Sequence, residues 1–279
     1  MRRAIGRLAQ VLVLAGAAGV AVAVGKVGAP LGTANASERP AFLRPPTGAA
    51  RAEREKDRID SAQVRRLLQA ARGANTVMCE LAAMTVDGRS GWSSGMDGAF
   101  RAGGSADSLA RDVTSWVHHE GIDATAVPLL RAALSDADWC VRRLAAPVLG
   151  RSRDAAAIQA MLAALAASDA ATREMGALAL GFAEDPRSIA PLVARLRDDS
   201  PRVRATAAWA LGEIETREAV RPLIDALADA DAMVRESVAH ALGEIEDAAA
   251  VPALTDLLKS DRESAVRRAA ARALGEIVG

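Results

Sequence analysis

The sequence has no tyrosine and few other aromatic residues, with three Phe and four Trp among 279 residues. Lysine occurs at only three positions, and basic and acidic residues balance at 35 each. A compact single-core domain of this length normally holds more large side chains. A protein that binds nucleic acid non-specifically normally carries net positive charge. The composition therefore argues against a thick aromatic core and against a nucleic-acid partner.

Alanine takes the place of the missing large residues, with 66 copies in the chain. Alanine has the highest intrinsic helix propensity, and its small side chain lets helix axes approach closely. Hydrophobic residues make up 51% of the chain, which is more than a disordered protein contains. The composition predicts an all-α protein with thin, repetitive packing.

Residues 1–36 are typical of an export signal. Arg2 and Arg3 precede an apolar run over residues 8–24, and Ala34-Asn35-Ala36 supplies small residues at the positions that a signal peptidase reads. We predict cleavage after Ala36 and an exported protein, periplasmic or extracellular. Two alternatives stay open: residues 8–24 form an uncleaved anchor in the inner membrane, which would be the chain's one membrane contact, or they form a cytosolic core helix.

Two further segments precede the regular part of the chain. Residues 37–60 combine prolines with a charged run and are predicted to be a linker. Residues 61–122 contain helical patterns around a glycine-rich loop at 87–105. We expect them to form an atypical helical N-terminal cap. Trp92 and Phe100 in the loop are interpreted either as plugs folded back on the cap or as partner contacts.

An internal repeat dominates residues 123–279. The dipeptide Leu-Gly recurs with spacings of 31, 31, 31 and 32, and a Val or Thr followed by Arg stands eight residues before each Leu. The five dipeptides begin at Leu149, Leu180, Leu211, Leu242 and Leu274. Each unit has a short apolar segment, a turn, and then a second apolar stripe at helical spacing. A pair of short helices cannot bury its apolar face alone, so the units must stack into an α-solenoid of about five helix pairs.

The repeat resembles a known family. The segments VRATAAWALGEI (203–214), VRESVAHALGEI (234–245) and VRRAAARALGEI (266–277) look like the HEAT-like repeat of the phycobilisome-lyase type. The segment CELAAMTVDGRSGW (79–92) is similar to one in bacterial exported HEAT-repeat proteins. The resemblance implies the solenoid fold for residues 125–279. It carries little functional content, because such repeats serve many unrelated proteins.

An Asp in the turn and an Arg in the second helix also recur. Asp136, Asp198, Asp229 and Asp261 each lie five residues before the Val of their unit. Such an Asp can accept hydrogen bonds from amides at a helix start, and the Arg can bridge to a neighbouring unit's Asp or carbonyls. We interpret this pattern as a structural ladder, with a phosphate-binding arginine row as the alternative.

One face of the second helix varies while the core positions repeat. It consists of the residues at −6, −2 and +2 from the Leu, which lie along one side of a helix. In this family the second helices line the concave side, which solenoids use to hold partners. We therefore predict a non-catalytic scaffold that binds a protein there, with a solvated helix face as the alternative. The candidate contact residues are Arg143, Glu174, Phe182, Trp209, Glu236, His240 and Arg272.

Enzymatic readings find little support in the residues. His118 and His119 point in different directions on a helix and lack a third metal ligand, so we predict no metal, no cofactor and no catalytic residue. The family resemblance keeps a lyase-like or cofactor-handling enzyme open as an alternative, and the N-terminal run keeps a membrane-tethered sensor or adaptor open. Whether the protein is an enzyme is therefore undecided, with the balance toward none.

Cys79 and Cys140 are the two cysteines of the chain. Export would permit a disulfide between them. Free cysteine is also a common small core residue, and the sequence favours two separate buried thiols.

Overall fold

We describe the protein from a computed structural model, which describes residues 58–76, 79–80, 82–83, 121–152 and 154–279. The predicted signal or anchor with Ala36 and most of the linker lie outside these residues, as do the loop at 87–105 and His118 and His119. Within the described residues, no helix combines the length and the apolar character needed to cross a bilayer.

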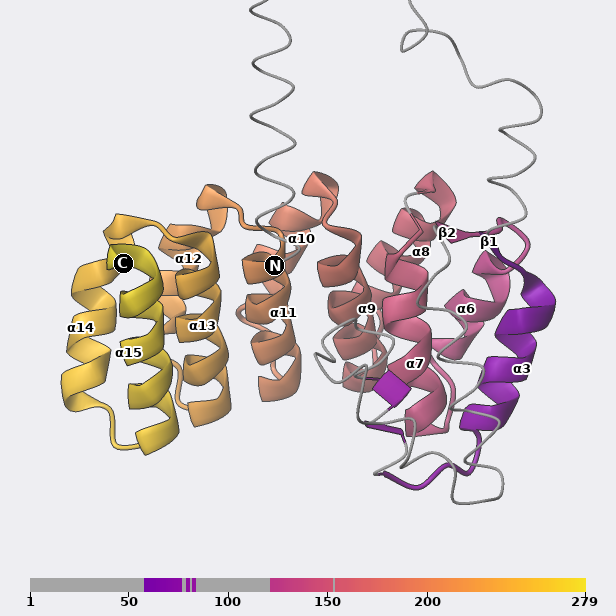
Figure 1. The fold of residues 1–279 in the computed structure, drawn as a ribbon, viewed down its shortest axis with the longest axis horizontal. Helices are drawn as coiled ribbons and strands as arrows, with labels where there is room; N and C mark the ends of the chain where they lie inside the picture. Colours follow the sequence, from indigo (N-terminus) through magenta and orange to yellow (C-terminus); the bar gives the residue numbers. More distant parts are fainter. Residues whose placement is uncertain (1–57, 77–78, 81, 84–120, 153) are drawn as a thin grey trace, which may run out of the picture. The chain divides into compact units, whose positions relative to one another are not determined.

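The fold is an all-α solenoid of five helix pairs, which confirms the predicted architecture (Figure 1). We call the pairs units one to five. They are α6 (Val127–Ala133) with α7 (Trp139–Gly150), α8 (Ala155–Leu165) with α9 (Ala170–Ala183), α10 (Ile189–Arg195) with α11 (Pro201–Glu213), α12 (Val220–Ala226) with α13 (Ala232–Ile245), and α14 (Val251–Ser260) with α15 (Ser264–Val278). Short 3-10 turns at Pro186–Ser188, Arg217–Ala219 and Ala248–Ala250 open units three, four and five.

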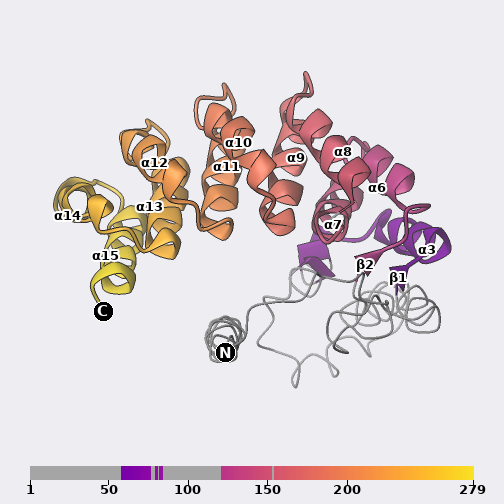
Figure 2. The same cartoon turned by 90° about the horizontal axis from the view of Figure 1, so that it is seen from above.

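The helices form two layers that curve (Figure 2). The first helices lie on the outer side of the curve and the second helices on the inner side, where α7, α9, α11, α13 and α15 pack on one another in order. The repeated Leu of each inner unit is fully buried, as Leu180 and Leu211 show. The core is a continuous row of Leu, Val and Ala, so no aromatic side chain is needed to fill it.

The repeated Gly explains how the units approach so closely. A Cβ atom added to Gly212 would lie 2.8 Å from the Cα atom of Ala241, and one added to Gly243 would lie 2.9 Å from the Cα atom of Ala273. Both distances are shorter than carbon atoms in contact normally allow. Glycine is therefore required where each second helix meets the alanine of the next unit.

A cap precedes unit one. Strand β1 (Arg58–Ile59) pairs in parallel with β2 (Gly121–Ile122), and α3 (Ser61–Ala71) follows β1. Asp60 caps α3 through a reciprocal pair of hydrogen bonds with Gln63. The predicted linker at 37–60 is thus too long at its C-terminal end, because Ile59 is buried and Asp60 starts a helix.

The structure joins Cys79 to Cys140 in a disulfide. The preference for two separate thiols is therefore corrected. Both residues are buried, and the bond ties the cap to the start of α7. The sequence could not decide this, because 61 positions separate the two residues and most of that stretch follows no repeat.

Candidate functional site

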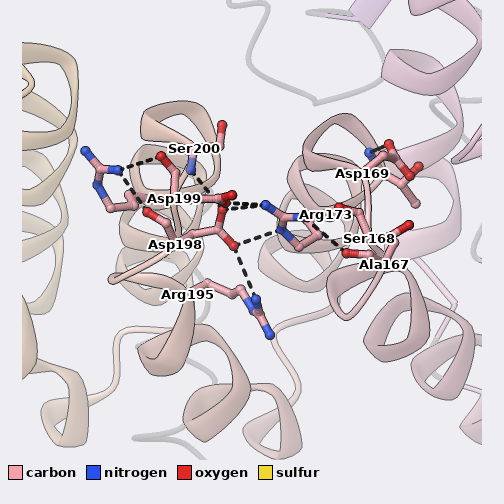
Figure 3. A network of polar contacts seen from close by, with 10 residues as sticks. Ala167, Ser168, Asp169, Arg173, Arg195, Asp198, Asp199 and Ser200 are labelled. Carbon is pink, nitrogen blue, oxygen red and sulfur yellow. Dashed lines mark hydrogen bonds and ion pairs between the residues drawn. The ribbon is translucent and has the colours of Figure 1, made fainter.

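The recurring Asp and Arg form a ladder along the solenoid, as predicted (Figure 3). Arg204 shows the pattern: its Nε and Nη2 atoms donate to the two carboxylate oxygens of Asp229 in the next unit, at 2.7 and 2.9 Å. Its Nη1 atom donates to the backbone carbonyls of Asp198 and Asp199 in its own turn. We call each contact between an Arg and the next unit's Asp a rung.

Each rung also supports the turn that carries it. A carboxylate oxygen of Asp198 accepts from the backbone N–H of Ser200, the N-cap of α11, while Arg173 holds both oxygens from the previous unit (Figure 3). Burial opposes ionisation of Asp198, but the hydrogen bonds from Arg173 and Ser200 outweigh it and hold the pKa of Asp198 well below its usual range. The ladder thus acts as an internal structural device, and the arginines of its complete rungs, Arg173, Arg204 and Arg235, are engaged rather than offered to phosphate.

Two rungs depart from the pattern. In unit two the Asp position holds Ala167, so the rung from Arg142 lacks its acid, and Arg142 keeps its bonds to the carbonyls of Asp136 and Ala137. At the first unit the cap supplies the arginine, because Arg72 at the end of α3 donates to both carboxylate oxygens of Asp136. The cap therefore closes the N-terminal end of the ladder.

The varied inner face contains a pocket, which we call the Trp209 pocket. It is a cavity of about 280 Å³ bounded by second helices of units one to four. Phe182 and Trp209 pack against each other with ring centroids 5.2 Å apart and planes tilted by 57°. The complete lining consists of Arg143, Glu174, Leu178, Phe182, Arg202, Ala205, Thr206, Trp209, Met233 and Ser237.

The charged residues of the pocket carry net positive charge. Arg202 binds Glu174 through two hydrogen bonds of 3.0 and 2.8 Å, and the contact with Glu174 raises the pKa of Arg202 above its usual value. Arg143 adds a second guanidinium to the lining. Because Arg202 is 63% exposed, its pair with Glu174 is open to water and can rearrange when a partner binds.

The structure brings together four of the seven predicted contact residues. Arg143, Glu174, Phe182 and Trp209 line the pocket, whereas the other three do not. His240 is not part of the lining that holds Trp209 and Phe182, and it lies 3.8 Å from Glu244 on its own helix. Of the remaining two, Arg272 pairs with Glu276 on its own helix, and Glu236 is exposed.

Sequence reasoning missed four residues of the pocket: Arg202, Thr206, Met233 and Ser237. They stand nine and five residues before the Leu of their unit, whereas only the positions at −6, −2 and +2 were considered. Met233 is 42% exposed, which is rare for a large apolar side chain among the described residues. A scan of every variable position in the repeat, rather than one stripe, would have found them.

In the part of the chain that the structure describes, no three His, Cys, Asp or Glu side chains are placed to hold a metal ion together. The inner face therefore offers shape, aromatic surface and charge rather than a set of metal ligands.

Comparison with known proteins agrees with this architecture. A family profile of HEAT repeats matches residues 126–205 and 189–275, which together span more than half of the chain. The chain belongs to the HEAT-repeat family. HEAT repeats are protein-interaction scaffolds, since their stacked units present extended surfaces to partners. The sequence matches no curated protein.

Several solved structures are similar to this HEAT-repeat protein. The complex of CpcE and CpcF of phycocyanin lyase from Nostoc sp. PCC7120 shares 29% identity at a TM-score of 0.45; the match covers 54% of this chain and 64% of that one, so less than two thirds of that relative is spanned. An engineered protein shares 22% identity over 77% of this chain and 96% of its own, with a TM-score of 0.42. Human deoxyhypusine hydroxylase shares 18% identity with a TM-score of 0.39, and the match covers 82% of this chain and 98% of that one.

Proposed function

We propose that this HEAT-repeat protein is a non-catalytic scaffold that holds a protein partner on the inner face of its solenoid, with the Trp209 pocket as the anchoring point. The observation that carries the proposal is the tilted Phe182–Trp209 pair in the lining of a cavity on the varied face of the repeat. Aromatic residues in such pockets dominate the binding energy of protein interfaces.

The size and charge of the pocket indicate which segment of a partner protein it can bind. A cavity of about 280 Å³ lies at the bottom of the range for small-molecule and cofactor pockets, and it suits one bulky apolar side chain of a partner. The guanidinium of Arg202 stands on the lining beside Glu174, and because it is 63% exposed it can turn to an acidic group of the partner. The partner segment is therefore an apolar anchor residue followed or preceded by an acidic residue.

Selection of a random peptide library against the immobilised protein tests this proposal. We expect enriched peptides to share an aromatic or large aliphatic residue next to Asp or Glu. Trp209→Ala should weaken a selected peptide by about thirtyfold, as loss of a central aromatic contact does. His240→Ala is the matched control, because His240 lies on the same helix face outside the pocket, and it should leave the affinity within about twofold.

Two outcomes would contradict the proposal. One is a selection without any shared anchor residue. The other is a peptide that binds Trp209→Ala and the original protein equally well while the helical circular dichroism of both is the same. Binding that is unchanged in Arg202→Ala but still weakened in Trp209→Ala would remove only the acidic part of the motif.

We also propose that the protein works outside the cytoplasm. The disulfide between Cys79 and Cys140 supports this location, because disulfides persist in oxidising compartments. The export pattern in residues 1–36 supports it independently. N-terminal sequencing after expression of the whole chain in a bacterial host is the test: a mature chain beginning at Ser37 is expected, and an intact N-terminus in the cytosolic fraction would contradict it.

A further inference from the structure

The ladder has a gap between units one and two, inside the solenoid. In each complete rung the Arg donates through Nε and Nη2 to an Asp 25 or 26 positions later, as Arg204 does to Asp229. The position 25 residues after Arg142 holds Ala167, whose side chain ends at Cβ. A helix pair lies on each side of this position, so the gap is a feature of the repeat itself.

The guanidinium of Arg142 is held in the same way as those of the complete rungs. Its Nη1 atom donates to the backbone carbonyls six and five residues earlier, as Nη1 of Arg204 does in its own turn. A guanidinium is a rigid plane, so fixing Nη1 also fixes the direction of the edge that carries Nε and Nη2. Among the described residues, no carboxylate bonds to this edge of Arg142. The donor half of a rung is therefore preformed.

The turn that carries Ala167 keeps the arrangement of a complete rung (Figure 3). The Nη1 atom of Arg173 donates to the backbone carbonyls of Ala167 and Ser168, as the rung arginine of unit three does in its own turn. Ala167 and Arg142 are both partly exposed, so a group from solution can reach them. This rung differs from the complete ones in its missing carboxylate and not in the backbone that frames it.

One acidic residue lies near the gap. Asp169 caps α9 by accepting from the backbone N–H of Thr172. This contact is the main cause that lowers the pKa of Asp169, and Arg142 adds an electrostatic contribution without forming a bond to it. Asp231 holds the same position in unit four, where the rung is complete. An acidic residue at this position therefore does not exclude a second carboxylate on the arginine.

We propose that the gap between Arg142 and Ala167 binds a carboxylate group in the place of the missing Asp. The carboxylate accepts from Nε and Nη2 of Arg142, because the fork of an arginine matches the two oxygens of a carboxylate. A free small carboxylate and the acidic side chain of a partner both present this group. Neither Arg142 nor Ala167 lines the Trp209 pocket, so the proposal does not rest on the scaffold function.

Titration of isotope-labelled protein with sodium acetate tests this site, with sodium chloride holding the ionic strength constant. In proton–nitrogen spectra we expect a saturable shift of the Arg142 Nε–H resonance, assigned by its loss in Arg142→Lys, toward the resonances of the rung arginines. Ala167→Asp supplies the carboxylate from the chain itself and should reduce this shift at least about tenfold. Asp229→Ala is the matched positive control, because it opens an equivalent gap at Arg204, whose resonance should then respond to acetate.

A second variant and a second probe complete the test. Ala167→Asn fills the gap with a neutral side chain and should also abolish the response, with the helical circular dichroism unchanged. The blocked amino acid N-acetyl-aspartic acid N-methylamide distinguishes the two sources: a response to it assigns the site to acidic side chains, and a response to acetate alone assigns it to free carboxylates. No saturable shift, a shift that chloride reproduces, or an equal shift in Ala167→Asp would overturn the proposal.

Discussion

The close approach of the units at the repeated glycines predicts opposite effects for one substitution at two equivalent positions. In Gly212→Ala the new Cβ atom would lie 2.8 Å from the Cα atom and 3.0 Å from the Cβ atom of Ala241. Carbon atoms in contact normally lie about 3.5–4.0 Å apart, and the atom in the way belongs to the backbone of a helix, so the units must separate. In Gly275→Ala the new atom meets nothing within 4 Å.

The magnitudes follow from two competing effects. Forcing one extra methyl group into a packed interface costs about 1–3 kcal/mol. Replacing glycine by alanine inside a helix stabilises by about 0.5–1 kcal/mol, because alanine loses less backbone freedom on folding. Gly212→Ala should therefore lower the free energy of unfolding by about 1–2 kcal/mol. Gly275→Ala should raise it by up to about 1 kcal/mol, since only the second effect operates there.

Urea denaturation followed by circular dichroism measures both changes. Repeat proteins can unfold unit by unit, so native-state hydrogen exchange of the amides in α11 and α15 should accompany the denaturation curves. Each variant serves as the control of the other, because the chemical change and the repeat position are the same. Equal effects of the two substitutions, in either direction, would refute the claim that the repeated glycine is required by inter-unit contact.

The other predictions concern the rungs, their pH dependence and the disulfide. Arg204→Ala should lower the free energy of unfolding by about 2–4 kcal/mol, because it leaves the partly buried carboxylate of Asp229 without its partner. Arg267→Ala should lower it by less than about 1 kcal/mol, because Arg267 bonds to carbonyls of its own turn and leaves no carboxylate unpaired. Similar losses for both variants in urea titrations would be inconsistent with the ladder. The depressed pKa of Asp198 adds stability that is fully present above about pH 4 and is lost as pH falls through the folded pKa, so Asp198→Asn should flatten the acid side of a stability–pH curve; an unchanged acid slope would argue against it. Replacing both Cys79 and Cys140 by Ala should destabilise the cap by about 4 kcal/mol, which is the loop entropy that the bond removes from the unfolded chain for a separation of 61 residues. Hydrogen exchange of the cap amides measures this loss, and unaltered protection of those amides would contradict it.

The fold was readable from the sequence because its signals are local and repeated. The Leu-Gly register, the turn prolines and the apolar stripes each lie within one unit, and five copies reinforce one another. Pro186 and Pro201 begin a 3-10 turn and a helix where the pattern places helix starts. Even the ladder could be expected, because the spacing of Asp and Arg is constant.

The site was only partly readable. The variable face predicted two residues of the pocket, Phe182 and Trp209. Arg202 and Met233 also line the pocket, but they lie at positions that the periodicity of one helix does not single out. They reach the pocket from the starts of α11 and α13. His240 has the right register and lies outside the pocket.

The sequence by itself determined the solenoid, its number of units and the residues that stack, since these depend on helical periodicity and on side-chain size. The tertiary structure alone decided three other matters: that Cys79 and Cys140 are joined, that the cap closes the first rung, and that Gly275 faces open space. Each depends on the distance between atoms far apart in the chain or on the presence of a neighbour. A repeat pattern records that a surface is made for stacking, and only the packed structure shows whether something is stacked on it.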